Sequence, residues 1–232
     1  MGFQFQFQPV LARMDALLDG LWLTLQLAGT GILLGALLGI LLAMLRGLSP
    51  RPVRLLVDSY VELVRNTPFL VQLLIVFFGV PSLGLRLSAE QAALAAIILN
   101  LGAYATEIVR AGIESVHKSQ IEAGLSLAMT RWQVFRHVVL APALARVWPA
   151  LSSQFVLMML STSVCSFISV QELSAQAANV ESETFRSFEV YILVTAIYLG
   201  LALVLRGVLA GLGLILFPPG SGLGRLRGQA GR

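Results

Sequence analysis

The chain has little charge for its length. Charged residues make up 12% of its 232 residues, hydrophobic residues make up 57%, and the mean hydropathy is +0.83. A soluble domain typically has about 25% charged residues. The composition therefore excludes an ordinary soluble globular protein and indicates a chain that lies mostly in a membrane.

Cysteine and histidine are scarce, and a nucleotide-binding loop is missing. The single cysteine, Cys165, excludes a disulfide within the chain. His117 and His137 both lie in one polar stretch and have no metal-ligand spacing with Cys or Asp, so no metal site is predicted. An intramembrane hydrolase is also disfavoured, because it needs a nucleophile and a base at membrane depth. Without a GxxxxGK[ST] phosphate loop, the chain is not expected to hydrolyse ATP by itself.

Long apolar runs dominate what is present. A helix needs about 20 apolar residues to cross roughly 30 Å of hydrocarbon. About five such runs occur, at residues 21–45, 55–80, 91–111 and 147–170 and from residue 189 on. They are continuous rather than alternating, which favours helices over a β-barrel. We therefore predict an all-α membrane protein with about five transmembrane helices.

Basic residues gather in three of the segments outside these runs. They follow the first run, follow the third run and end the chain: Arg46, Arg51, Arg54; Arg110, Lys118, Arg131, Arg136, Arg146; and Arg225, Arg227, Arg232. The positive-inside rule places such segments in the cytoplasm. We therefore predict an outside N-terminus and a cytoplasmic C-terminus. The net charge of +4 then follows topology and does not indicate nucleic-acid binding.

Polar side chains lie at membrane depth in the third and fourth runs. By helical spacing, each set shares one face: Asn100, Tyr104 and Glu107 in the third run, and Gln154, Met158, Ser161 and Cys165 in the fourth. Polar groups in lipid are costly and usually face a bundle interior or a wet pathway. They either border a translocation path or make interhelical hydrogen bonds without touching the solute, and the sequence leaves both open.

The first two runs carry structural signals. Gly31, Gly35 and Gly39 recur every four residues, which predicts a ridge that another helix can approach closely. The alternative is that glycine is simply common in membrane helices.

In the second run, Pro68 is expected to kink the helix, and Thr67 to bond a backbone group that the kink frees. Glu62 and Arg65 are three residues apart and are predicted to form a local ion pair.

The polar block at residues 119–142 separates the third run from the fourth. Ser119 with Glu122, and Thr130 with Gln133, each fit a capping box. Two short helices are therefore predicted, with a break near residues 128–130. Trp132 begins an apolar stripe that continues through Phe135 and Val139 on the second helix. An amphipathic hairpin lying on the bilayer is the alternative to an ordered helix–turn–helix.

This block resembles the EAA loop of the permease subunits of ABC importers. Glu122, Ala123 and Gly124 stand at its start, and Val-Val-Leu at 138–140 stands near its end. Further segments resemble the polar amino-acid branch, over about residues 19–206 in register: Glu-Leu-Val-Arg-Asn-Thr-Pro at 62–68, Val-Gln-Leu at 71–73, Gly-Ala-Tyr at 102–104, Glu-Ile-Val-Arg at 107–110, Gly-Ile at 112–113, Ser-Thr-Ser at 161–163 and Phe-Arg-Ser-Phe-Glu-Val-Tyr at 185–191.

Three positions depart from the pattern of that family. Ala128 replaces a glycine, and Ala141 replaces a proline that comes one residue late as Pro142. Leu160 precedes the Ser-Thr-Ser segment where a polar or basic residue is expected.

The resemblance implies a type I importer permease with a cytoplasmic coupling-helix loop between spans three and four. It implies a second permease subunit (a copy or a paralogue), two cytoplasmic ABC ATPase subunits and an extracytoplasmic substrate-binding protein, in the bacterial inner membrane. ATP and Mg would then be bound by the partner ATPase, and no cofactor by this chain. The implied substrate is a polar amino acid. A small zwitterion such as an opine is the alternative, and a passive channel is disfavoured by the ordered cytoplasmic loop.

The resemblance also assigns residue roles. Coupling to the ATPase is expected of Glu122, Ala123, Gly124, Ala128 and Arg131, with Gly124 permitting close approach of the partner. Polarity at membrane depth, and not the resemblance, is the reason to expect these residues in the translocation path: Asn100, Tyr104, Gln154, Ser161 and Thr162. Local spacing and the proline kink make Glu62, Arg65 and Pro68 structural.

The expected division of the chain has three parts. They are an extracytoplasmic segment at 1–18, a permease domain at 19–217 with its loop at about 112–146, and a basic cytoplasmic tail at 218–232.

Overall fold

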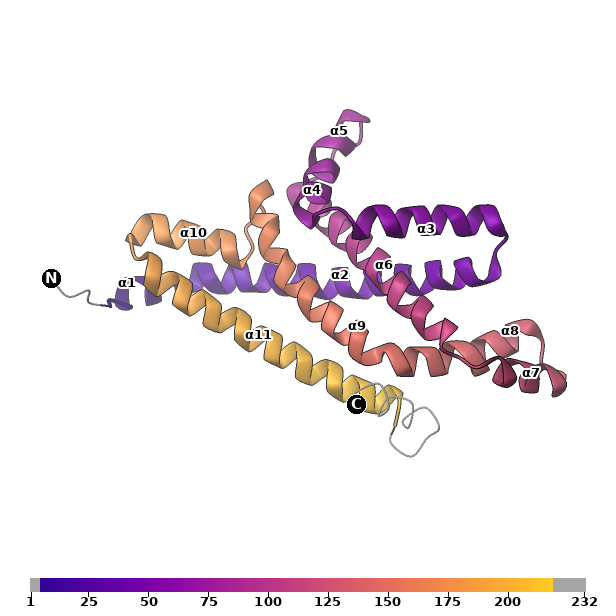
Figure 1. The fold of residues 1–232 in the computed structure, drawn as a ribbon. Helices are drawn as coiled ribbons and strands as arrows, with labels where there is room; N and C mark the ends of the chain where they lie inside the picture. The colour runs from indigo at the N-terminus through magenta and orange to yellow at the C-terminus, as the bar shows by residue number, and fades with distance from the viewer. Residues whose placement is uncertain (1–4, 219–232) are drawn as a thin grey trace.

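The computed structural model describes residues 5–218, in which every regular element is a helix (Figure 1). In chain order they are α1 (Gln8–Leu11), α2 (Met14–Leu48), α3 (Arg51–Arg65), α4 (Phe69–Leu74), η1 (Ile75–Gly79), α5 (Val80–Ser82), α6 (Ala89–Glu114), α7 (Lys118–Ser126), α8 (Arg131–Gln133), η2 (Val134–Leu140), α9 (Ala141–Ser161), η3 (Thr162–Ile168), α10 (Leu173–Thr184) and α11 (Ser187–Leu216). The predicted all-α class is confirmed.

Four helical stretches are long and apolar enough to cross a membrane: Met14–Leu48, Ala89–Glu114, Arg131–Ile168 and Ser187–Leu216. A fifth crossing results if the bent pair Arg51–Arg65 and Phe69–Ser82 is counted as one span. The two halves of that pair meet at 110°, so Pro68 breaks the helix rather than kinking it gently. The prediction of about five spans agrees with this count.

The break at Pro68 leaves backbone carbonyls that polar side chains satisfy. The Thr67 hydroxyl donates to Leu63 O at 3.0 Å, as predicted. The Gln72 amide nitrogen donates to Val64 O at 2.7 Å and to Thr67 O at 2.9 Å. A sharp bend at membrane depth is tolerable because these bonds replace the missing helical ones.

The predicted ion pair between Glu62 and Arg65 is wrong. Arg65 instead faces Glu107 on α6, at 3.6 Å between Nη1 and Oε1. Glu62 accepts a hydrogen bond from the Asn66 amide at 2.9 Å. A carboxylate on a neighbouring helix thus outcompetes the local partner for the arginine.

The glycine ridge of α2 carries the closest helix contact in the core. A Cβ added at Gly31, Gly35 or Gly39 would lie within 3 Å of atoms of Ile97, Leu101 or Ala105 respectively. Successive glycines along α2 meet successive residues along α6, so the two helices run in the same direction. The bent pair between them therefore brings the chain back. The ridge is a packing surface, and the alternative of incidental glycines does not hold.

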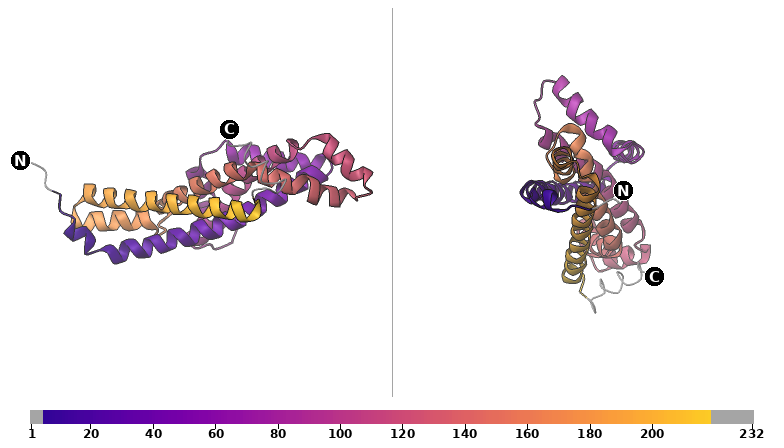
Figure 2. Two further views of the ribbon diagram at one scale, coloured as in Figure 1. Left: turned by 90° about the horizontal axis from the view of Figure 1, so that it is seen from below. Right: turned by 90° about the vertical axis from the view of Figure 1, so that its left-hand side faces the viewer.

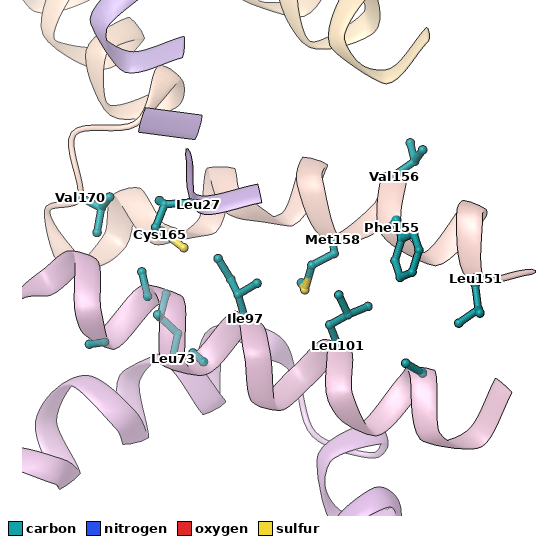
Figure 3. Packing of buried hydrophobic residues seen from close by; sticks show 14 of the residues in the cluster. Leu27, Leu73, Ile97, Leu101, Leu151, Phe155, Val156, Met158, Cys165 and Val170 are labelled. Atoms are coloured by element: carbon teal, nitrogen blue, oxygen red, sulfur yellow. The ribbon is translucent and has the colours of Figure 1, made fainter. Parts of the chain in front are cut away.

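The fourth and fifth spans complete the bundle. α9 runs opposite to α6, since Gly112 packs on Ala143 and Val147, while Met158 at the other end of α9 faces Leu101 in the core (Figure 3). α11 is held to α9 where the Trp148 indole donates to Leu209 O at 3.0 Å. α1 and α10 lie at one end of the elongated molecule, and α7 and α8 lie at the other (Figure 2).

The two ends of the chain fall partly outside the described residues. Residues 1–4 and 219–232, which hold most of the expected tail, are not described. From residue 5 on, the N-terminal segment is tied to the start of α11: Gln6 N donates to Glu189 Oε1 at 2.8 Å, and Arg186 donates to Gln6 Oε1 at 2.5 Å.

Candidate functional site: the α7–α8 block

The predicted pair of short helices is present at the end of the molecule. α7 and α8 follow α6, and α8 continues through η2 into α9. The second capping box is confirmed: Gln133 N donates to Thr130 Oγ1 at 3.3 Å, and Thr130 N donates to Gln133 Oε1 at 2.8 Å.

The first capping box is wrong. α7 begins at Lys118, so His117 is its N-cap and accepts from Ser119 N at 3.3 Å through Nδ1. Ser119 lies inside the first turn, and its hydroxyl bonds His117 Nδ1 at 2.7 Å. Glu122 is consequently exposed and unused as a cap.

The turn between the two helices requires an unusual backbone at Ala128. Its φ is +58°, in the left-handed region. A residue with a Cβ adopts this region at a conformational cost of about 1–2 kcal/mol, whereas glycine adopts it without that steric penalty. The glycine that the family pattern has at this position therefore has a backbone reason, and this chain keeps the turn without it.

Gly124 permits a close approach, but inside the chain. It is buried, and an added Cβ would lie 3.0 Å from a methyl of Val134 and 3.4 Å from one of Val138. The expectation that Gly124 faces a partner subunit is thereby corrected. Its missing side chain lets α7 pack directly on η2.

The underside of the block is apolar and fixed to the bundle. Phe135 and Val139 are buried with Val116 and Ala143, whereas Trp132 is 52% exposed and stacks on Phe135, at 6.2 Å between ring centroids. Two of the three residues of the predicted apolar stripe, Phe135 and Val139, are therefore buried, and Trp132 is not. We give the name coupling face to seven of the exposed residues of the block: Glu122, Ala123, Leu125, Leu127, Ala128, Arg131 and Trp132.

Ion pairs tie the helices together at the end from which the block departs. Arg46 of α2 contacts Asp58 of α3 at 2.5 Å and Glu114 of α6 at 3.5 Å. Arg110 contacts Glu107 and Glu114, at 2.5 Å and 2.6 Å.

On the other side, Arg146 of α9 donates to Ser115 O at 2.7 Å. Arg146 thus ties α9 to the end of α6, next to the block.

The predicted path residues fall into two groups. Asn100 is buried, and its amide donates to Gln72 Oε1 at 2.9 Å, which is the interhelical bond of the alternative interpretation. Tyr104 lies under the Arg65 guanidinium, 5.6 Å from the ring centroid. Thr162 is buried and donates to Met159 O at 2.6 Å.

On α9 and the η3 segment that follows it, the predicted polar face is only partly present. Met158 and Cys165 are buried in the core, whereas Gln154 and Ser161 are half-buried. Ser161 donates to Leu157 O at 2.9 Å. Within residues 5–218, the Gln154 side chain makes no hydrogen bond, so its amide oxygen and nitrogen are both free to bond another group.

A buried carboxylate that the sequence did not single out joins three helices at the opposite end. Glu172 Oε1 accepts from Ala175 N at 2.9 Å and caps α10, while Oε2 accepts from the Tyr198 hydroxyl at 2.7 Å. Thr24 of α2 accepts from Leu173 N at 3.1 Å. Burial raises the pKa of the Glu172 carboxyl above its usual range. The sequence signal was an acidic residue directly before a helix-prone segment.

We expect Glu172→Gln to remove a pH dependence of stability. Because burial raises the folded-state pKa of Glu172, the folded state holds its proton longer, and stability falls as pH rises from the ordinary carboxyl pKa through the raised one. Gln cannot ionise and keeps the acceptor, so the unfolding midpoint of the detergent-purified protein should no longer decline across that window. Glu172→Leu, which loses the cap, should cost about 1–2 kcal/mol. Identical pH profiles for wild type and Glu172→Gln would contradict this assignment.

Comparison with known proteins agrees with this architecture. Residues 35–213 match the family described as binding-protein-dependent transport system inner membrane component. The glutamine transport system permease protein GlnP of Escherichia coli K12 is 32% identical over 208 residues, which cover 89% of this chain and 95% of GlnP. The octopine transport system permease protein OccM of Rhizobium radiobacter is 37% identical over 193 residues, 79% of each chain.

A solved structure shares the fold. The crystal structure of an amino acid ABC transporter with histidines superposes with a TM-score of 0.83 at 34% identity, over 91% of this chain and 99% of that one. With a family match over most of its length, this chain belongs to the binding-protein-dependent inner membrane components and is a multi-pass permease subunit of an ABC importer in the bacterial inner membrane.

Proposed function

We propose that this permease subunit forms, with a second permease subunit, the path by which a polar amino acid enters the cell. Two cytoplasmic ATPase subunits drive the transport, binding ATP and Mg, and an extracytoplasmic binding protein delivers the substrate. The relatives named for glutamine and octopine support an amino acid or a closely related zwitterion. The observation that carries the proposal is the α7–α8 block, which presents an exposed apolar face while its underside is fixed to the spans.

The coupling face is the proposed ATPase dock. Leu125 is 45% exposed and Leu127 is 78% exposed, which is unfavourable for a block predicted to lie in water unless something covers them. Glu122 and Arg131 flank them with opposite charges that a partner can pair. Because Gly124 and Val134 interlock beneath, the face moves as one body with η2.

The substrate class can be tested on the reconstituted complex. We expect ATP hydrolysis to rise when the binding protein is loaded with one polar amino acid, and not with the others, in a panel that includes glutamine, arginine and octopine. Stimulation by none of them, with stimulation by an unrelated solute, would reject the amino-acid assignment. Solute flux without ATP would favour the passive channel instead.

The proposed orientation places the N-terminus outside and the α7–α8 block in the cytoplasm. Ser88 is the N-cap of α6 and Ser126 ends α7, so the two positions bracket the third span and both are exposed. Single-cysteine variants at these positions, in a Cys165→Ala background, should label from opposite sides with an impermeant maleimide. Ser88→Cys should react in intact cells, and Ser126→Cys only after permeabilisation. Labelling of both from one side would overturn the orientation.

The translocation path is proposed to border Gln154 and Ser161. Gln154→Leu and Ser161→Leu should lower transport at least about tenfold, the effect of removing one or two hydrogen bonds to a charged solute. Neither should change the unfolding midpoint, because neither side chain bonds another helix. Asn100→Leu should lower both transport and the midpoint, since it leaves Gln72 without its partner. Normal transport by both α9 variants would remove them from the path.

A further inference from the structure

Arg206, in the second half of α11, has no carboxylate partner within residues 5–218. Arg206 and Glu189 are the two side chains of α11 that are charged at neutral pH. Within residues 5–218 it forms no ion pair and no hydrogen bond, and residues 1–4 and 219–232 contain no Asp or Glu. Charged groups in membrane helices are rare and normally paired, so an unpaired arginine here indicates an external anion.

Arg206 lines a cavity of about 350 Å³ between α11 and α9. The opposite wall consists of Trp148, Pro149, Ser152 and Ser153, with Ala210 beside the arginine. The Ser152 hydroxyl is buried and has no hydrogen-bond partner within the described residues, and it is the one such side-chain atom found there. An unsatisfied donor beside an unpaired cation is a binding arrangement for an anionic oxygen.

The position of this cavity, toward one end of the bundle and on another face of α9, separates it from the proposed path. Arg206 is seventeen residues after Glu189, about 25 Å along the helix axis, which is close to the thickness of the hydrocarbon layer. Trp148 beside it follows Arg146, which bonds the end of α6, so the cavity lies toward the end of the bundle that bears the α7–α8 block. Gln154 is only about 3 Å along α9 from Ser152, but it and Ser161 lie roughly 160–180° around the helix from Ser152, on the opposite face.

The surroundings fit a phospholipid better than a solute. Only 11% of the apolar window of α11 is buried within the chain, so most of that helix faces lipid or another subunit. Tryptophan is typical of the level where acyl chains meet headgroups. Basic pockets between membrane helices on the cytoplasmic side bind anionic headgroups. A carboxylate of the transported amino acid would instead be expected on the face of α9 that carries Gln154 and Ser161.

We propose that Arg206 and Ser152 bind the phosphate of an anionic phospholipid of the cytoplasmic leaflet. The guanidinium donates to two phosphate oxygens, and the Ser152 hydroxyl donates to a third acceptor position. Trp148 covers the glycerol region, while its own N–H remains bonded to Leu209 O. The bound lipid holds α11 against α9 at the side where the protein itself leaves a cavity.

The test adds phosphatidylglycerol or phosphatidylcholine to the delipidated permease–ATPase complex and measures the bound lipid by native mass spectrometry. We expect wild type to retain phosphatidylglycerol preferentially. Arg206→Gln should weaken that binding about tenfold, and Ser152→Ala about threefold, as expected for one charged and one neutral hydrogen bond. Arg206→Lys should keep most of it. Arg51→Gln, the same change at an exposed arginine of α3 outside the cavity, should bind like wild type.

Three results would overturn the proposal. Equal phosphatidylglycerol binding by wild type and Arg206→Gln would show that the arginine merely reaches water. Displacement of the lipid by millimolar inorganic phosphate would assign the site to a free anion. Dissociation of the complex by Arg206→Gln, with unchanged lipid binding by the released permease, would show that Arg206 pairs with an acidic side chain of a neighbouring subunit.

Discussion

Replacing Gly39 by valine is expected to prevent the permease from reaching its folded state in useful yield. An added Cβ at this position would lie 2.4 Å from the Ala105 Cβ, 2.9 Å from Thr106 N and 3.0 Å from Ala105 C. Backbone atoms cannot rotate away as a side chain can, so α2 and α6 would have to separate. That separation also breaks the bond from the Thr106 hydroxyl to Gly39 O, 3.3 Å long. The loss should exceed the usual overpacking penalty of about 1–3 kcal/mol.

The matched control is Gly29→Val, ten residues earlier on the same helix. A Cβ there meets nothing within 4 Å. It adds the same β-branched side chain to a membrane helix, so any general effect of losing glycine appears in both variants. The measurement is the amount of monodisperse protein and its unfolding midpoint in detergent. Equal yields and midpoints for the two variants would show that the α2–α6 contact is looser than this geometry.

Single-helix features were predictable from the sequence because their causes are local. The apolar runs locate the spans, yet α2 extends over Met14–Leu48 rather than 21–45. A helix can continue through the polar interface after its apolar residues end. The capping box of Thr130 and Gln133 could be predicted because both partners lie within four residues of the sequence. The spacing of the α2 glycines predicted a packing ridge, although not the partner helix.

Features that depend on a second helix could not be predicted from the sequence. Arg65 pairs with Glu107 rather than with Glu62, because α6 places a carboxylate beside it. Residue spacing within one helix cannot predict a contact with another helix. The position of Gly124 against Val134 likewise follows from how the chain reverses at Ala128. Glu172 was missed because its partners, Tyr198 and Thr24, come from segments far away in the chain. The sequence thus predicts which segment forms the candidate site, but not which of its side chains face the bundle and which face outward.

The exposed apolar part of the coupling face gives the second large prediction. Leu127→Asp should weaken ATPase association about 30-fold or more, because an interface anchor is worth about 2 kcal/mol and the new carboxylate would be buried without a partner. Leu127 is 78% exposed, so the substitution should leave folding intact. Leu83→Asp is the matched control: Leu83 is 80% exposed and lies in the turn after α5, far from the block. Pull-down of the ATPase subunits by each purified variant gives the comparison.

Gly124→Trp separates the shape of the block from its surface. The indole would collide with Val134 and lift α7 from η2, so this variant should lose ATPase binding or uncouple hydrolysis from transport while still inserting. Glu122→Ala should act more mildly, since one exposed polar contact is worth about 0.5–1.5 kcal/mol. If Leu127→Asp binds ATPase normally while Gly124→Trp does not, the dock lies on another face of a block whose internal packing still matters. If both variants assemble and hydrolyse ATP like wild type, with substrate-stimulated rates, the α7–α8 block is not the element that receives the ATPase motion.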